Sequence, residues 1–121
     1  MSEKFTLIID DDPIVREAVK DILELIEVNV MEASNGIEGV KLFESHSEQV
    51  SLIILDMIMP GMNGYDVLQK VRSISPSIKV IMSSGLSEAK VENQTYPQQP
   101  DEYLFKPYEL DMLINSVKKY Y

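Results

Sequence analysis

The most constraining feature of this sequence is a short apolar run that ends in a single carboxylate. Residues 52–55 are all aliphatic, and the run has the length of a buried strand. Asp56 follows at once, and Pro60 and Gly61 then interrupt regular structure. We therefore expect Asp56 at the carboxyl end of a buried strand, the edge of a parallel sheet where ligands bind. Taken alone, the same aspartate could equally cap the next helix.

Strand-like and helix-like segments alternate along the chain. The predicted strands are residues 5–9, 29–33, 52–55, 79–82 and 102–105. Helical spacing of apolar residues predicts helices after Asp12, Gly36 and Asn63, a short one over about 87–93 and a last one over about 109–120. The predicted inward stripes include Ile37 in the second helix and Leu110 in the last. This alternation implies an α/β protein with a parallel sheet covered on both faces.

Polar residues follow the predicted strands at the points where those strands end. Right-handed crossovers place the carboxyl ends of all parallel strands at one edge of the sheet. The residues that can meet there are Asp10, Asp11, Asp56, Ser83, Ser84 and Lys106. Each has a plain structural alternative, namely an acidic turn, a helix cap or a solvated lysine. Their joint position at strand ends favours a shared site.

A cluster of this composition suits a particular chemistry. Three adjacent carboxylates repel one another unless a cation is present, and oxygen-only ligands suit Mg²⁺. A carboxylate can also attack phosphorus and form an aspartyl phosphate. Phosphoryl transfer needs positive charge on the phosphoryl oxygens, which Mg²⁺ and Lys106 could provide. The hydroxyl of Ser84 could donate one more hydrogen bond.

Composition excludes several classes of protein. The chain has 121 residues, the length of one domain, and its 11 basic and 20 acidic residues give a net charge of −9. That charge argues against direct binding to nucleic acid or to an anionic membrane. There is no cysteine, no signal peptide and no apolar run of about 18 residues. We therefore expect a cytoplasmic protein. We assign no role to His46 and expect Met57, Met59 and Met62 to pack and not to bind metal.

The whole chain resembles the receiver domains of two-component response regulators. The resemblance is carried by the segments Ile8 to Asp11, Asp56 to Gly64, Ser84-Gly85 and Lys106-Pro107. It implies a single domain over residues 1–121 with a five-stranded, doubly wound, flavodoxin-like fold. It also implies a phosphorylation-controlled signalling module whose phosphoryl donor is a sensor histidine kinase or a histidine phosphotransfer protein.

The resemblance also implies roles for individual residues. Asp56 would be the phosphoacceptor, and Mg²⁺ would be held by Asp10, Asp11, Asp56 and the backbone carbonyl of Ile58. Ser84 and Lys106 would bind the phosphoryl group, Ser84 and Tyr103 would form the switch, and Pro107 would follow a cis peptide bond. The residues flanking the attacking water in hydrolysis would be Ile58 and Leu86, two apolar side chains that imply slow hydrolysis.

Two other hypotheses compete with this one. A haloacid-dehalogenase-like phosphatase also uses an aspartate after a strand, and Asp10 and Asp12 fit its opening motif loosely. That family needs a further acidic pair after its lysine, and only Glu109 and Asp111 follow Lys106. A degenerate receiver that is never phosphorylated would lack an acidic or lysine position, and none is missing here. The polar stretch Asn93 to Pro100 departs from the family pattern and leaves the partner and the mode of association open.

Overall fold

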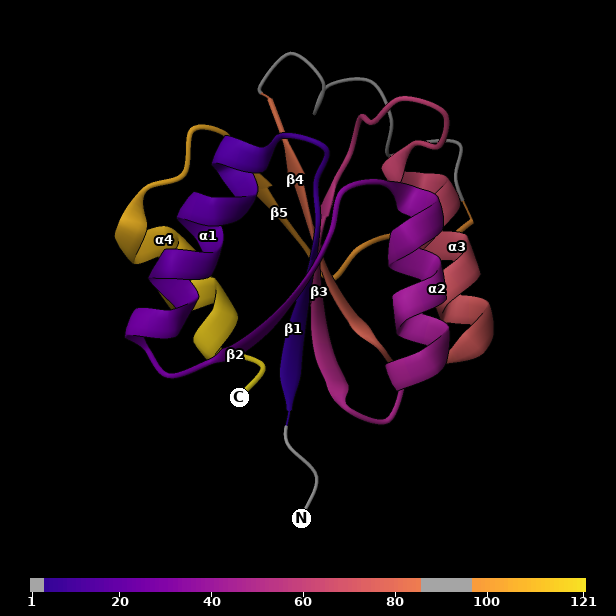
Figure 1. Ribbon diagram of the computed structural model, residues 1–121, viewed down its shortest axis with the longest axis horizontal. Coiled ribbons are helices and arrows are strands. Elements are labelled where there is room, and N and C mark those ends of the chain that lie inside the picture. The colour runs from indigo at the N-terminus through magenta and orange to yellow at the C-terminus, as the bar shows by residue number, and fades with distance from the viewer. Residues whose placement is uncertain (1–3, 86–96) are drawn as a thin grey trace.

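The computed structural model describes residues 4–85 and 97–121, which contain a five-stranded parallel sheet between helices (Figure 1). The strand order is β2-β1-β3-β4-β5. The strands are β1 (Phe5–Ile9), β2 (Asn29–Ala33), β3 (Val50–Asp56), β4 (Lys79–Ser84) and β5 (Glu102–Phe105). All five predicted strands are confirmed. β3 is longer than predicted at both ends, because Val50 pairs with Phe5 and Asp56 pairs with Ser83. β4 is longer because its pairing with β5 continues through Ser84.

Four helices lie in the described part of the chain, and polar side chains fix where three of them begin. They are α1 (Pro13–Leu25), α2 (Gly36–His46), α3 (Gly64–Ile74) and α4 (Leu110–Lys118). The Asp12 carboxylate accepts a hydrogen bond from the backbone N–H of Ile14 at 2.9 Å. Asn35 and Asn63 cap α2 and α3 in the same way. The short helix predicted over about 87–93 lies outside the described residues.

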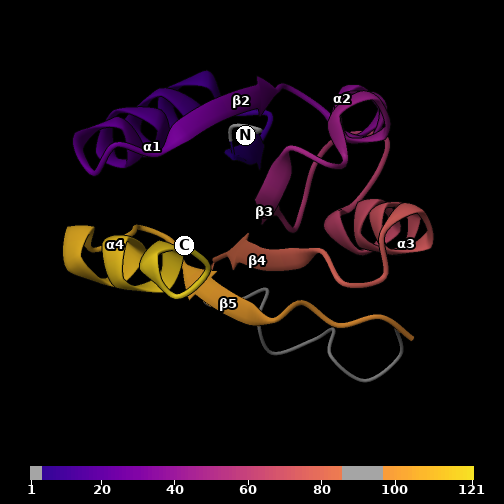
Figure 2. The ribbon, with the colours of Figure 1, turned by 90° about the horizontal axis from the view of Figure 1, so that it is seen from below.

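The helices cover both faces of the sheet. α1 and α4 pack on one face and α2 and α3 on the other (Figure 2). The first pair encloses an α1/α4 core that includes Ile8, Ile54 and Leu113, and the second encloses an α2/α3 core that includes Phe43 and Tyr65. Side chains alternate between the two cores along each strand. The side chain of the last residue in each strand therefore points to one particular face of the sheet.

Ile37 and Leu110, which were predicted on the inward stripes of their helices, are exposed. Ile37 is 59% exposed, because the face that α2 turns to the sheet contains Gly36, Gly39 and Phe43 instead. A Cβ atom on Gly39 would lie only 2.5 Å from Ile9 Cδ1, so the helix approaches the sheet too closely for a larger side chain. Leu110 is 50% exposed because it is the first residue of α4 and no preceding turn covers it.

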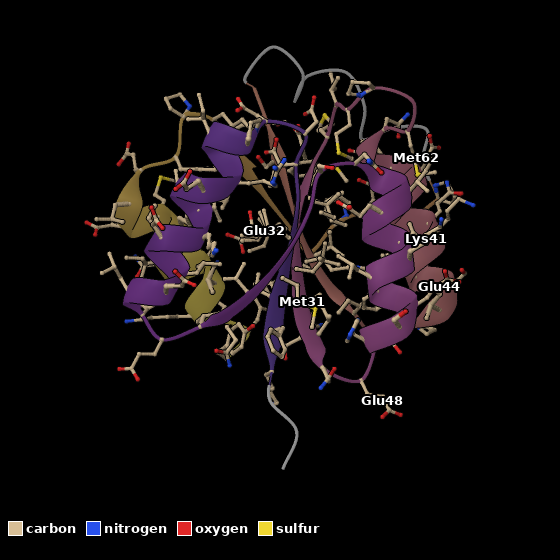
Figure 3. The ribbon with its side chains drawn as sticks, in the orientation of Figure 1. Met31, Glu32, Lys41, Glu44, Glu48 and Met62 are labelled. Carbon is tan, nitrogen blue, oxygen red and sulfur yellow. The ribbon has the colours of Figure 1, made fainter. Side chains whose placement is uncertain are left out.

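The charged side chains of α2 lie on the outside of this arrangement. Lys41 and Glu44 of α2 and Glu48 after it are exposed on the outer side of the molecule (Figure 3). Met31 of β2 and Met62 are partly buried and pack against the α2/α3 core. Met57 and Met59 are buried in that core, so the predicted packing of these two methionines is confirmed.

Candidate functional site

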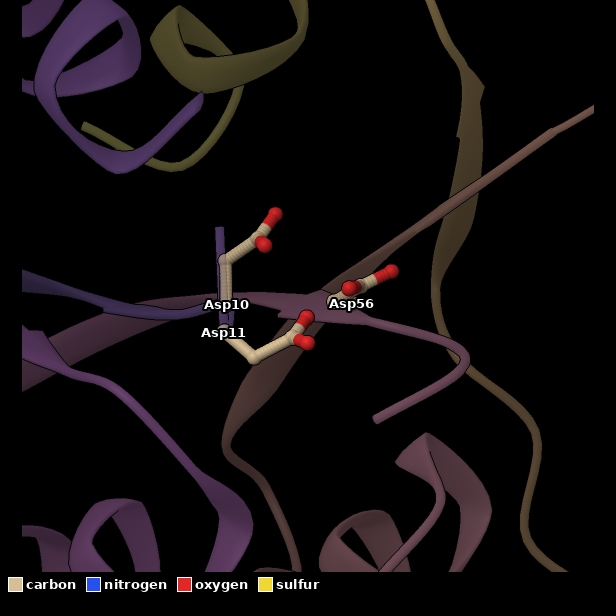
Figure 4. Close-up of side chains that lie close together, drawn as sticks. All are labelled: Asp10, Asp11 and Asp56. Carbon is tan, nitrogen blue, oxygen red and sulfur yellow. The ribbon is translucent and has the colours of Figure 1, made fainter. Parts of the chain in front are cut away.

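Three carboxylates meet at the carboxyl edge of the sheet. Asp10 and Asp11 follow β1, and Asp56 is the last residue of the adjacent strand β3. Each offers one oxygen, and these oxygens lie within 4.8 Å of one another. Asp11 extends its carboxylate toward Asp56 (Figure 4). Asp10 and Asp56 are buried whereas Asp11 is exposed, so the cluster opens to solvent on the Asp11 side.

Lys106 is the cation of this cluster. Its Nζ donates to Asp56 Oδ1 at 3.2 Å and to Asp10 Oδ2 at 3.3 Å. Lys106 follows β5, and its backbone N–H donates to the carbonyl of Ser84 at 2.8 Å. The Lys106–Pro107 peptide bond is cis. The chain therefore brings one positive charge from β5 across the end of β4 to two buried carboxylates.

The electrostatics of the cluster make Asp56 a weaker acid than an ordinary aspartate. Burial raises the pKa of Asp56 to about 7, and the negative charge of Asp10 adds to the shift. Lys106 opposes this shift but does not cancel it. Burial acts to lower the pKa of Lys106, yet the charges of Asp56 and Asp10 outweigh it and hold that pKa above its ordinary value. The site thus carries more negative charge than Lys106 alone neutralises.

The backbone around the carboxylates is held firmly in place. The N–H of Asp12 donates to Asp10 Oδ1 at 2.9 Å, and Arg16 Nη1 donates to the Asp10 carbonyl at 2.7 Å. The N–H of Gly64 donates to the carbonyl of Met57 at 2.7 Å. A Cβ atom on Gly64 would lie 2.7 Å from the carbonyl oxygen of Asp56, so only glycine fits there. Arg16 was not among the predicted site residues.

β4 ends in two serines, Ser83 and Ser84, whose buried hydroxyls differ in their hydrogen bonding. The Ser83 hydroxyl is hydrogen-bonded to the hydroxyl of Tyr108. The Ser84 hydroxyl is fully buried and has no hydrogen-bond partner among the described residues. A buried hydroxyl without a partner is rare. Strand alternation turns Ser83 to the face of Asp56 and Ser84 to the opposite face.

Tyr103 is partly buried and packs against the α2/α3 core. Its hydroxyl is hydrogen-bonded to that of buried Tyr65 in α3 and donates to Gln99 Oε1 at 3.2 Å. Tyr103 was predicted at a switch position, but its hydrogen bond with Tyr65 was not predicted. No sequence pattern connects the two residues apart from their both being tyrosines.

The donor set fits a hard divalent cation. Mg²⁺ holds oxygen ligands at about 2.0–2.1 Å, so two ligands of one ion lie at most about 4.2 Å apart. Carboxylate oxygens within 4.8 Å of one another need only a small inward shift to reach that spacing. The excess negative charge of the site favours the binding of a cation. Ile58, whose carbonyl is a further candidate ligand, has a side chain that is 56% exposed. The other proposed water-flanking residue, Leu86, lies outside the described residues.

Comparison with known proteins agrees with this geometry. The family described as response regulator receiver domain matches residues 6–118. A probable C4-dicarboxylate response regulator of Bacillus subtilis, DctR, is 34% identical over 94% of this chain and 50% of its own length. The chemotaxis protein CheY of Listeria monocytogenes is 29% identical over 93% of this chain and 94% of its own length.

A solved structure extends the comparison. The response regulator TrrA of Thermotoga maritima, in complex with Mg²⁺-BeF, has a TM-score of 0.86 and 32% identity, covering 98% of this chain and 99% of that one. The chain spans half or less of the length of the first curated relatives it matches. Within residues 4–85 and 97–121, no helix has the length and apolar content needed to cross a membrane.

Proposed function

Because the chain belongs to the response regulator receiver domain family, the phosphorylation-controlled signalling modules of two-component systems, we propose that Asp56 is its phosphoacceptor. One observation carries this assignment. Asp56 ends β3, the central strand of the sheet, where Lys106 contacts it at 3.2 Å and Asp10 and Asp11 lie beside it. A nucleophilic carboxylate needs such neighbours, because the phosphoryl group that it receives brings negative charge into the site.

In the proposed reaction, an Asp56 carboxylate oxygen attacks phosphorus and forms a P–O bond. The bond from phosphorus to the donor atom breaks, and the donor leaves with that electron pair. Lys106 moves from bonding the Asp56 carboxylate to bonding one phosphoryl oxygen. The Ser84 hydroxyl, which has no partner in the described part of the chain, is available to another phosphoryl oxygen. Asp10, Asp11, Asp56 and the Ile58 carbonyl would hold Mg²⁺, which supplies further charge neutralisation when bound.

The proposed donor is a sensor histidine kinase or a histidine phosphotransfer protein, because such proteins act on receiver domains. The phosphatase alternative is not favoured, since the family match covers most of the chain and is to receiver domains. The degenerate-receiver alternative has no support either, because both acidic positions, Asp56 and Lys106 are all in place. We propose further that residues 1–121 act as one receiver domain.

The test uses a small phosphoryl donor. Wild type incubated with acetyl phosphate and Mg²⁺ should gain the mass of one phosphoryl group, and Asp56→Ala should gain none. Asp21→Ala, which removes an exposed carboxylate from α1, should behave as wild type. Equal labelling of wild type and Asp56→Ala would move the acceptor elsewhere.

A further inference from the structure

A buried pair of hydroxyls lies beside the proposed phosphoacceptor, and the reaction just described does not use it. Ser83, in β4, is 1% exposed. Its hydroxyl is hydrogen-bonded to the hydroxyl of Tyr108, whose side chain packs against the α1/α4 core. Tyr108 stands two residues after Lys106 in the segment that joins β5 to α4. The pair therefore links the end of β4 to the segment that carries the cation of the site.

The sheet register places this link next to Asp56. Asp56 and Ser83 are paired positions of the parallel strands β3 and β4, so their side chains share one face about 5 Å apart. The backbone supports the same closeness, because the N–H of Met57 donates to the carbonyl of Ser83 at 2.9 Å. Ser83 thus contacts the acceptor strand through its backbone and the Lys106 segment through its side chain.

Lys106 is consequently held on both sides by consecutive residues of β4. At Lys106 itself, the backbone N–H donates to the Ser84 carbonyl at 2.8 Å. Two residues after Lys106, the Tyr108 hydroxyl is hydrogen-bonded to the Ser83 hydroxyl. Between these two attachments the Lys106 ammonium bridges Asp10 and Asp56. A lysine side chain has many rotamers. Anchoring the chain at the Lys106 N–H and at the Tyr108 side chain restricts where the ammonium group can lie.

We propose that the Ser83–Tyr108 hydrogen bond is a positioning device that keeps Lys106 in place for phosphorylation of Asp56. The proposal rests on the proposed function of Asp56. Ser83 and Tyr108 are positioning residues and do not touch the phosphoryl group. Small displacements of a group that must meet a transition state slow a reaction strongly, so loss of the bond should lower the phosphorylation rate by about three- to tenfold.

The alternative is that this hydrogen bond is only structural, so that each buried hydroxyl merely provides a hydrogen-bond partner for the other. The two explanations differ for the double variant Ser83→Ala/Tyr108→Phe. Removing both partners leaves no unsatisfied polar atom, so the thermal midpoint should stay near that of wild type. If the bond is only structural, phosphorylation should then be normal as well. If the bond positions Lys106, phosphorylation stays slow in a stable protein.

The experiment compares the full chain with this double variant and with the conservative variant Ser83→Thr, which keeps a hydroxyl. Three quantities are measured: the rate of Asp56 phosphorylation by acetyl phosphate, the Mg²⁺ dissociation constant from thermal shift, and the hydrogen exchange of the Lys106 amide. The double variant should phosphorylate slowly and exchange the Lys106 amide faster. Its Mg²⁺ dissociation constant should change less than about twofold, because no proposed ligand is altered. Ser83→Thr should recover most of the rate.

A matched control exists at the opposite end of the sheet. Thr6 in β1 is fully buried, and its hydroxyl is bonded to that of Tyr121 at 2.5 Å. Thr6→Val/Tyr121→Phe removes a comparable pair and should leave the rate and the Lys106 exchange unchanged. A wild-type rate or wild-type exchange in Ser83→Ala/Tyr108→Phe would overturn the proposal. Failure of wild type to be phosphorylated would instead overturn the proposed function, while the Lys106 exchange would still decide whether the bond positions this residue.

Discussion

Lys106 Nζ lies 3.2 Å from Asp56 Oδ1, although the two residues are 50 positions apart in the chain. The contact forms because β5 and β3 end at the same edge of the sheet, with β4 between them. It does not bring Asp56 to an ordinary acidity, since burial and Asp10 still hold its pKa at about 7. The folded protein therefore binds a proton at Asp56 over a pH range in which the unfolded chain does not.

This relationship predicts how stability depends on pH when no metal is present. Between about pH 4 and pH 7 the native state binds more protons at Asp56 than the unfolded state, so its contribution to the free energy of unfolding falls as pH rises. Asp56→Asn carries no charge at any pH. The variant should gain stability relative to wild type across this range, by at most about 1.4 kcal/mol for each pH unit.

Denaturant unfolding in EDTA at several pH values measures this difference. Glu44→Gln, which removes an exposed charge from α2, should show no comparable trend. A difference between Asp56→Asn and wild type that does not vary from pH 4 to pH 8 would contradict the proposed protonation.

Mg²⁺ should stabilise the fold through the same carboxylates. Bound cation relieves the repulsion among Asp10, Asp11 and Asp56, and mass action adds about 1.4 kcal/mol at a metal concentration ten times the dissociation constant. The thermal midpoint of wild type should therefore rise with MgCl₂ at constant ionic strength. Asp11→Ala should lose most of the rise and Asp21→Ala should keep it. An undiminished rise in Asp11→Ala would remove Asp11 from the proposed ligand set.

Ser84 should couple phosphorylation to the region around Tyr103. The Ser84 hydroxyl has no described partner, and a phosphoryl oxygen would offer one. The Tyr103 hydroxyl is hydrogen-bonded to that of Tyr65 in this structure. Phosphorylation should therefore slow amide exchange over residues 102–105 by stabilising an arrangement that already exists. Ser84→Ala should still be phosphorylated without this change, and identical exchange in both states of wild type would count against the coupling.

Ile58 should slow hydrolysis of the aspartyl phosphate. Its side chain is 56% exposed, stands two residues after Asp56 and cannot orient a water molecule. Ile58→Asn could hold the attacking water and should shorten the phosphorylated lifetime by up to about tenfold, or about 1.4 kcal/mol of barrier. Decay after donor removal in excess Mg²⁺ measures the effect. Ile37→Asn changes an isoleucine that is 59% exposed in α2 and should leave the lifetime unchanged. Equal lifetimes for Ile58→Asn and wild type would exclude this role.

The strands and the polar residues at their ends depend on local sequence pattern, and most of them were predicted from the sequence. Each strand is a short apolar run, and the polar residue after it is visible in the sequence. The meeting of Asp10, Asp56 and Lys106 could therefore be anticipated, because parallel strands end at one edge of the sheet. The exposure of Ile37 could not, because it depends on how closely Gly39 lets α2 approach Ile9.

The tertiary hydroxyl pairs were also missed. Tyr65 and Tyr103 are 38 residues apart, and Ser83 and Tyr108 are 25 apart. No periodicity connects either pair, since each depends on where a helix or a loop lies over the sheet.

The central claim is that Asp56 itself receives the phosphoryl group, and chemical trapping tests it most directly. Borohydride reduces an aspartyl phosphate to homoserine, whereas it leaves a free carboxylate unchanged. After treatment with acetyl phosphate and Mg²⁺, reduction and proteolysis, tandem mass spectrometry should find homoserine at position 56 and aspartate at positions 10 and 11. Homoserine at position 10 or 11, or no homoserine in a protein that has gained a phosphoryl group, would contradict the account.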